Sequence, residues 1–172
     1  GALGDLIQTT GVFKSIREAH QGDNITLLVD RKFDFFIKHA PFFDRIFYDT
    51  RSSFFRIDIW IKIIIKLSKE KFDIVYDLQS SDRTSIYNFF ININNSCKWS
   101  GNRRGGQFKY HPDNFEDIPV LDRLFHQLKL TGLKVNLIPD LTWMDKDISA
   151  FIPKNKFVVL IPGSSVHLKH KR

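Results

Sequence analysis

Strand-like and helix-like segments alternate along nearly the whole chain, and this alternation constrains the fold more than any other feature. Short apolar runs typical of buried strands cover residues 25–29, 45–48, 72–78, 97–100 and 157–161. Segments with helical spacing of apolar residues cover 5–19, 33–39, 54–71, 82–93 and 120–130. This order predicts an α/β fold with a parallel, doubly wound sheet. In such sheets, ligands bind at the carboxyl ends of the strands.

Several polar residues and two glycine-containing turns follow the ends of predicted strands. Asp77 and Gln79 lie at the end of the run 72–78, and Asn102 and Arg103 follow the run 97–100. Because parallel strands end at the same edge of a sheet, we expect these side chains to lie near one cleft.

The first glycine-containing turn, Gly1-Ala2-Leu3-Gly4-Asp5, leads directly into a predicted helix. A turn at the start of a helix can receive an anion or present a side chain at the positive end of the helix dipole. The turn lacks the G-x-G-x-x-G dinucleotide fingerprint. Taken alone, Asp5 also fits an ordinary acidic residue in a first helical turn.

The second turn, Pro162-Gly163-Ser164-Ser165, follows the last predicted strand, with three basic residues, Lys169, Lys171 and Arg172, close behind it. It lacks the G-K-[ST] ending of a P-loop. Hydroxyls, backbone N–H groups and cations would nevertheless suit a diphosphate, although a basic surface loop has the same composition.

The net charge of +7 indicates a polyanionic partner or simply a lysine-rich surface. Nucleic acid, anionic lipid and a phosphorylated glycan all fit the charge, but no nucleic-acid-binding motif is present, so we expect no nucleic-acid partner. The single cysteine, Cys97, excludes an internal disulfide and favours a reducing compartment. No apolar run reaches the roughly 20 residues that span a bilayer.

The predicted helix 54–71 has two interpretations. Asp58, Lys62, Lys66 and Lys69 form a polar stripe at helical spacing, and most other positions are apolar. This pattern is typical of a helix packed on a sheet with one solvated stripe. It also fits a basic amphipathic helix that lies on an anionic membrane surface.

Metal-ligand patterns are weak. Asp145-Lys146-Asp147 has the D-x-D form that holds a metal in some nucleotide-sugar enzymes, but no supporting residues accompany it. The six histidines lack zinc-site spacing. We therefore expect no metal site.

Four segments, in this order, resemble glycosyltransferase family nine, the lipopolysaccharide heptosyltransferases. Residues 4–10 (GDLIQTT) resemble the family's G-D-x-[LIV]-x-[TS]-[TL]-P segment, with Gly11 or Thr10 where proline is usual. Residues 72–80 (FDIVYDLQS) are similar to Y-D-x-[VI]-[IV]-D-x-Q-G, with Ser80 in place of glycine. Residues 99–104 (WSGNRR) match a loop of glycine and basic residues, and 159–172 resembles [HP]-x-[AG]-[ST]-[ST]…K-[RH]-W-P up to Lys171-Arg172.

The resemblance implies the GT-B architecture, in which two Rossmann-like lobes face a cleft. Residues 1–152 would form the N-terminal acceptor-binding lobe without its first strand. Residues 153–172 would form the linker and the first strand and loop of the C-terminal lobe, which binds the nucleotide sugar. With most of that lobe missing, we expect the chain alone to be inactive.

The resemblance also implies an inverting transfer of a heptose, or a related sugar, from an ADP-sugar to the inner core of lipopolysaccharide. Asp5 matches the catalytic base, and Lys171 matches the lysine at the donor phosphates, which Ser164 and Ser165 would also bind. Gly4, Thr9, Gln79, Arg103 and Arg104 are the expected acceptor contacts. The two arginines are chosen because guanidinium groups pair with phosphate and carboxylate.

The expected partners are the nucleotide-sugar donor and a phosphorylated glycolipid acceptor, Kdo-lipid A or the inner core. No metal or other cofactor is expected. The expected location is the cytoplasm, with peripheral contact at the anionic inner face of the bacterial inner membrane. Two alternatives stay open: a transferase of the same fold with another donor or acceptor, and a non-catalytic α/β module that binds a nucleotide or anion.

Overall fold

The chain folds into a mixed α/β structure whose strands pair in parallel. The computed structural model describes residues 3–50, 57–93, 96–103, 105–147 and 149–158. Strand β1 (Thr26–Asp30) pairs with β2 (Arg45–Asp49), with Thr26 opposite Arg45. Strand β3 (Ile74–Tyr76) pairs with β4 (Lys98–Ser100), with Ile74 opposite Lys98. The predicted parallel α/β class is confirmed.

Among the residues that the structure describes, the two strand pairs form separate ladders. A strand edge can pair only with another strand that comes within hydrogen-bonding reach. No described strand pairs with both β1 and β3, so the two ladders stay separate. Both ladders still pack into one core: Leu28 of β1 and Val75 of β3 contact the same apolar cluster.

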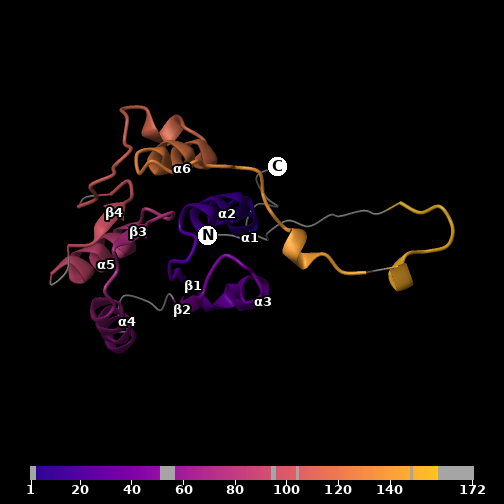
Figure 1. Ribbon diagram of the computed structural model, residues 1–172, viewed down its shortest axis with the longest axis horizontal. Helices are drawn as coiled ribbons and strands as arrows, with labels where there is room; N and C mark the ends of the chain where they lie inside the picture. The colour runs from indigo at the N-terminus through magenta and orange to yellow at the C-terminus, as the bar shows by residue number, and fades with distance from the viewer. Residues whose placement is uncertain (1–2, 51–56, 94–95, 104, 148, 159–172) are drawn as a thin grey trace, which may run out of the picture.

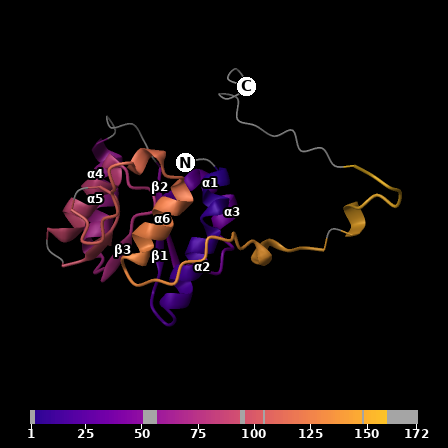
Figure 2. The same ribbon diagram turned by 90° about the horizontal axis from the view of Figure 1, so that it is seen from above.

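Six α-helices flank the strands in the described part of the chain: α1 (Leu3–Gln8), α2 (Thr10–Ala19), α3 (Asp34–Ile37), α4 (Ile57–Lys69), α5 (Asp82–Asn92) and α6 (Val120–Lys129). Figure 2 shows α4 and α5 together on one side of the strands and α2 on the other, with α6 in front of the strands in this view. The helices α2 to α6 all occupy segments in which the sequence predicts helix.

The buried faces follow the helical spacing of the sequence. Trp60, Ile63 and Leu67 of α4 pack with Tyr87 and Ile91 of α5 in one cluster. On the other side of the strands, Val12 and Ile16 of α2 pack with Leu128 and Leu133. Apolar residues at intervals of three and four positions thus place one face of each helix in the core.

The predicted helix 5–19 is divided at Thr9 into α1 and α2. The Thr9 hydroxyl donates to the Asp5 carbonyl over 2.7 Å, and the Thr10 hydroxyl donates to the Ile7 carbonyl over 2.7 Å. Threonine hydroxyls that bond to preceding carbonyls compete with the backbone ladder. Two of them in succession, just before Gly11, explain the interruption.

Local signals set two other helix ends. Ser81 caps α5 in a reciprocal box, since its hydroxyl accepts from the Thr84 N–H (3.3 Å) and its own N–H donates to the Thr84 hydroxyl (2.9 Å). Gly132, two residues past the C-cap of α6, adopts a φ of 85° that favours glycine.

Beyond α6 the chain crosses α2 and then leaves the folded body. The Asp140 N–H donates to the Thr10 hydroxyl over 2.9 Å, whereas residues 149–158 are all exposed and extend away (Figure 1). Phe157 and Val158 are not in a strand, so the predicted strand 157–161 is wrong at these two positions, which pair with none of the described strands. The other residues of this predicted strand lie outside the described chain. The boundary near 152 stays a prediction.

Candidate functional site

A cavity of about 200 Å³ lies at the carboxyl ends of β3 and β4, where the strand order predicts ligand binding. Its walls come from the turn after β3, the turn after β4, the loop before α6 and the first turns of α6. The lining residues are Leu78, Gln79, Ser80, Asn102, Arg103, His111, Phe115, Glu116, Val120, Arg123 and Leu124. Gln79 and Arg103, predicted from separate motifs, therefore meet at one site.

The turn after β3 is held in an uncommon backbone conformation by its own side chains. Ser80 has a φ of 50°, in the left-handed region that favours glycine. Its hydroxyl accepts from the Asn102 N–H over 3.1 Å and donates to the Asp77 carbonyl over 3.2 Å. Serine replaces the glycine of the resembled motif, and these bonds compensate for its strain.

The Asp77 side chain holds this turn in place through hydrogen bonds. Its Oδ1 atom accepts from the N–H groups of Gln79 (3.1 Å) and Ser80 (2.8 Å). Burial raises the pKa of Asp77, and hydrogen bonds from Thr84 and from these two N–H groups oppose the rise. Asp77 is not among the lining residues, but it lies next to the cavity through its bonds to Gln79 and Ser80, which do line it.

Gln127 of α6 joins the ends of the two strands. Its fully buried Nε2 atom donates to the carbonyls of Asp77 and Ser100, each over 3.1 Å, and lies 3.3 Å from the Ser100 hydroxyl. This amide fixes α6 over β3 and β4, and α6 in turn supplies one wall of the cavity. The sequence gives no signal for this role, because Gln127 lies on a helix far from both strands along the chain.

Asn102 and Arg103 give the cavity complementary polar groups. Asn102 is buried, and its Oδ1 atom has no hydrogen-bond partner among the described residues. The Arg103 Nε atom donates to the Ser80 carbonyl over 3.0 Å, and its side chain is 55% exposed. An unpaired buried acceptor beside a guanidinium suits a ligand that carries both a hydroxyl and an anionic group.

The opposite wall is an aromatic and charged loop that sequence reasoning missed. The Arg123 guanidinium lies 4.4 Å from the Phe115 ring centre and donates to the carbonyls of Ile118 (2.6 Å) and Glu116 (2.9 Å). His111 stacks on Phe115 at 4.5 Å. These residues lie in or beside a loop without regular periodicity, so only the structure brings them to the site.

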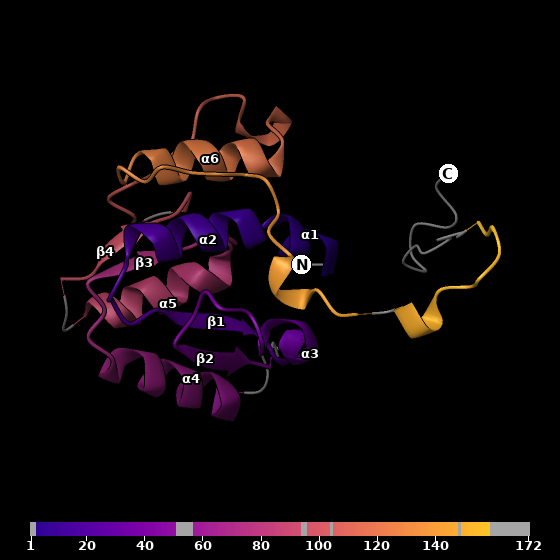
Figure 3. The same ribbon diagram turned by 45° about the vertical axis from the view of Figure 1, so that its right-hand side comes forward.

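The residues predicted from the first turn lie apart from the cavity lining. Gly4 and Asp5 are exposed on α1, and Thr9 separates α1 from α2. Figure 3 shows α1 at the same end of the body as α3, which follows the carboxyl end of β1. The helix α1, which carries Asp5 and packs with α3 through Leu6 and Ile7, therefore lies at the edge where β1 ends. Four other predicted site residues, Arg104, Ser164, Ser165 and Lys171, lie outside the described residues.

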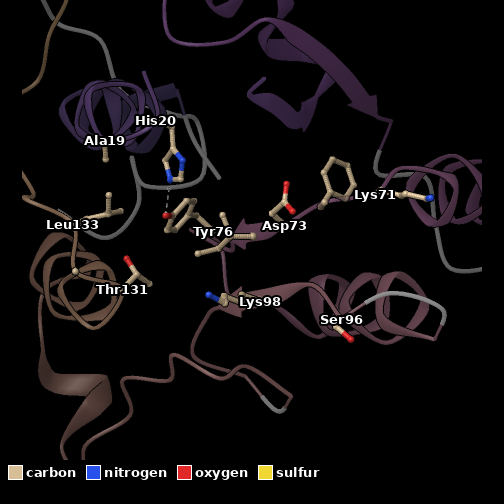
Figure 4. Close-up of a pocket in the computed structure, with 12 residues that line it drawn as sticks. Ala19, His20, Lys71, Asp73, Tyr76, Ser96, Lys98, Thr131 and Leu133 are labelled. Atoms are coloured by element: carbon tan, nitrogen blue, oxygen red, sulfur yellow. Dashed lines mark hydrogen bonds between the residues drawn. The ribbon is translucent and has the colours of Figure 1, made fainter. Parts of the chain in front are cut away.

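A larger cavity of about 650 Å³ lies at the opposite, amino-terminal ends of β3 and β4. Figure 4 shows His20 pointing toward Tyr76, and the His20 Nε2 atom lies 2.8 Å from the Tyr76 hydroxyl. Burial raises the pKa of Tyr76, which keeps its hydroxyl protonated. Ligands of parallel α/β sheets bind at the carboxyl ends of the strands, so this cavity at the amino-terminal ends is the weaker candidate for a substrate-binding site.

Two features are absent from the part of the chain that the structure describes. No group of three or more His, Cys, Asp or Glu side chains there has an arrangement that could hold a metal ion. No helix there combines the length and the apolar character that crossing a bilayer requires.

Comparison with known proteins gives one informative similarity. The chain is 29% identical over 94 residues to Lipopolysaccharide heptosyltransferase 1 from Campylobacter coli. The match covers 55% of this chain and 27% of that protein, so it spans about a quarter of the relative's length. No protein-family profile and no solved structure matches the chain.

Proposed function

We propose that this chain supplies the acceptor-binding lobe of an inverting GT-B glycosyltransferase, with the lobe boundary near residue 152. The reaction would move a heptose, or a related sugar, from an ADP-sugar to the inner core of lipopolysaccharide. The observation that carries the proposal is the partial similarity to a lipopolysaccharide heptosyltransferase. The cavity at the ends of β3 and β4 supports it, because it joins Gln79 and Arg103 from two separate motifs.

In this proposal the cavity binds the sugar and phosphate groups of a glycolipid such as Kdo-lipid A. Arg103, with Arg104 next to it in sequence, pairs with phosphate or carboxylate oxygens. The Asn102 Oδ1 atom accepts a hydrogen bond from a hydroxyl of the glycolipid. The Gln79 side chain provides a second amide that can hydrogen-bond to the same molecule. Gly4 and Thr9 would shape the approach to the same edge.

The chemical step is a single displacement with inversion. The acceptor oxygen forms a bond to the anomeric carbon, its proton passes to the Asp5 carboxylate, and the bond to the nucleotide diphosphate breaks with its electron pair on phosphate oxygen. Lys171, Ser164 and Ser165 would stabilise the charge that develops on the diphosphate. A lysine and hydroxyl donors can do so without a metal, and the reaction would occur at the cytoplasmic face of the inner membrane.

The test is transfer from ADP-heptose to Kdo-lipid A by the full-length gene product. Asp5→Asn keeps the shape of the side chain and removes the base, so turnover should fall by about 10²–10⁴-fold. Glu18→Gln, which neutralises an exposed acid on α2, is the matched control and should keep full turnover. Full turnover in Asp5→Asn would remove Asp5 from this role.

A second arm measures acceptor binding by calorimetry. Arg103→Ala and Asn102→Ala should each weaken binding by roughly 10-fold, whereas Lys134→Ala removes an exposed charge away from the cavity and should leave it unchanged. Unchanged binding in both cavity variants would place the acceptor elsewhere. Active transfer from another donor alone would instead support a same-fold transferase of different specificity.

A further inference from the structure

The outer face of the α4–α5 layer exposes large apolar side chains. Ile61 and Ile65 of α4 are 50% and 47% exposed, and Phe89 and Ile93, on and just after α5, are 65% and 55% exposed. Each pair is separated by four residues, so each forms a line along its helix. Four such side chains on two adjacent helices are more than the scattered apolar residues of an ordinary surface.

The two lines lie on one surface. Figures 1 and 2 show α4 and α5 side by side, and the Ser68 hydroxyl of α4 donates to the Phe90 carbonyl of α5 over 3.3 Å. Ile61 is seven residues, about two helical turns, before Ser68 and therefore points toward the same junction. Trp60 and Tyr87 occupy the inner faces, in the core.

Lysines flank this apolar surface. Lys62 and Lys69 of α4 are exposed and seven residues apart, and the Lys66 ammonium lies 3.5 Å from the centre of the Phe47 ring. Asp58 and Asp82 are the acids at the starts of the two helices. The centre of the face is thus apolar and its α4 side is cationic, in a chain of net charge +7.

We propose that this α4–α5 face, made of Ile61, Ile65, Phe89, Ile93, Lys62 and Lys69, docks on an anionic phospholipid surface. Apolar side chains would enter the boundary between headgroups and acyl chains, while the lysines reach headgroup phosphates. A second copy fits less well, because self-association would bring lysines of both copies together. The proposal extends the proposed function, whose acceptor is a lipid, but binding to vesicles does not depend on transfer.

The experiment is co-sedimentation of the protein with phosphatidylcholine vesicles that contain or lack phosphatidylglycerol. We expect binding to the anionic vesicles and little to the neutral ones. Lys62→Gln with Lys69→Gln should weaken binding by about 25-fold, at roughly five-fold per lysine. Ile61→Ser with Phe89→Ser should weaken it by about ten-fold or more.

The control variant carries Lys134→Gln and Ile138→Ser, the same kinds of change on the other side of the strands. All these positions are exposed, so circular dichroism should show unchanged folding. Equal binding to neutral vesicles, or equal loss in the control, would overturn the proposal. So would a concentration-dependent dimer that disappears in Ile61→Ser with Phe89→Ser. Transfer to a delipidated acceptor should be unchanged in the lysine variant, which separates failure of the membrane face from failure of the proposed function.

Discussion

The turn after β3 and the helix α1 lie at the same edge of the strands but are held in different ways. At the turn, the buried Asp77 carboxylate accepts from the Ser80 N–H, the Ser80 hydroxyl accepts from the Asn102 N–H, and Gln127 of α6 donates to the Asp77 carbonyl. In α1, Gly4 and Asp5 are exposed, and a Cβ added to Gly4 would meet no atom within 4 Å. The chain therefore builds the wall of the candidate cavity by itself, whereas α1 is held by Leu6 and Ile7, which pack against a core cluster, and Gly4 lies on its open side. Substitutions should cost stability at the turn and little at the exposed positions of α1, such as Gly4.

The largest effect should come from Gln127→Glu. A carboxylate at this fully buried position would face the carbonyls of Asp77 and Ser100 without a donor, so the free energy of unfolding should fall by about 3–5 kcal/mol near neutral pH. The loss should shrink in acid, where a protonated Glu can donate. Chemical denaturation at several pH values measures both effects, and Gln8→Glu, which adds the same charge to exposed α1, is the matched control. Equal losses of unfolding free energy in Gln127→Glu and Gln8→Glu would contradict the difference between the turn after β3 and α1.

Ser80 offers a pair of variants that separates strain from hydrogen bonding. Ser80→Ala keeps the left-handed conformation and removes the acceptor for the Asn102 N–H, which should cost about 1–3 kcal/mol. Ser80→Gly removes the same hydroxyl but relieves the strain, so it should be about 1 kcal/mol more stable than Ser80→Ala. Urea denaturation of both variants tests the difference. A glycine variant less stable than the alanine variant would show that φ is not left-handed here.

Asp77→Asn should produce a smaller effect whose sign depends on pH. Because burial raises the pKa of Asp77 above its ordinary value of 3.8, ionising it in the folded state destabilises the fold. This cost is absent well below pH 3.8 and is fully present above the raised pKa of the folded state. Asparagine can keep both turn hydrogen bonds through its Oδ1 atom. The free energy of unfolding of the variant, relative to that of the native protein, should therefore increase as pH rises; urea denaturation at several pH values measures it. If this difference does not change with pH, burial of the Asp77 carboxylate carries no net cost.

The sequence predicts the elements well because strand and helix periodicities are local. It also brings Gln79 and Arg103 together correctly, because parallel strands end at one edge. It does not predict the role of Gln127, whose partners are distant along the chain, or that of Arg123, whose partners lie in the irregular loop just before α6. Nor does it predict that the described strands form two separate pairs. The interruption of the predicted helix 5–19 at Thr9 has a local cause, two successive threonine hydroxyls. The spacing of apolar residues does not reveal it, because that spacing continues across the interruption.

The smallest effect should come from Gly4→Ala. Since a methyl group at this position meets no atom within 4 Å, and alanine favours helix, the free energy of unfolding should change by less than about 1 kcal/mol, toward greater stability. Gly11→Ala in the adjacent helix α2 is the comparison. Its Cβ would lie 2.2 Å from the Ile138 carbonyl oxygen, so this change should be clearly destabilising. Thermal denaturation of the two variants ranks them. A large loss in Gly4→Ala would show that the side of α1 with Gly4 is packed against the body as well as the side with Leu6 and Ile7, and the proposed base would then be held as rigidly as the cavity wall.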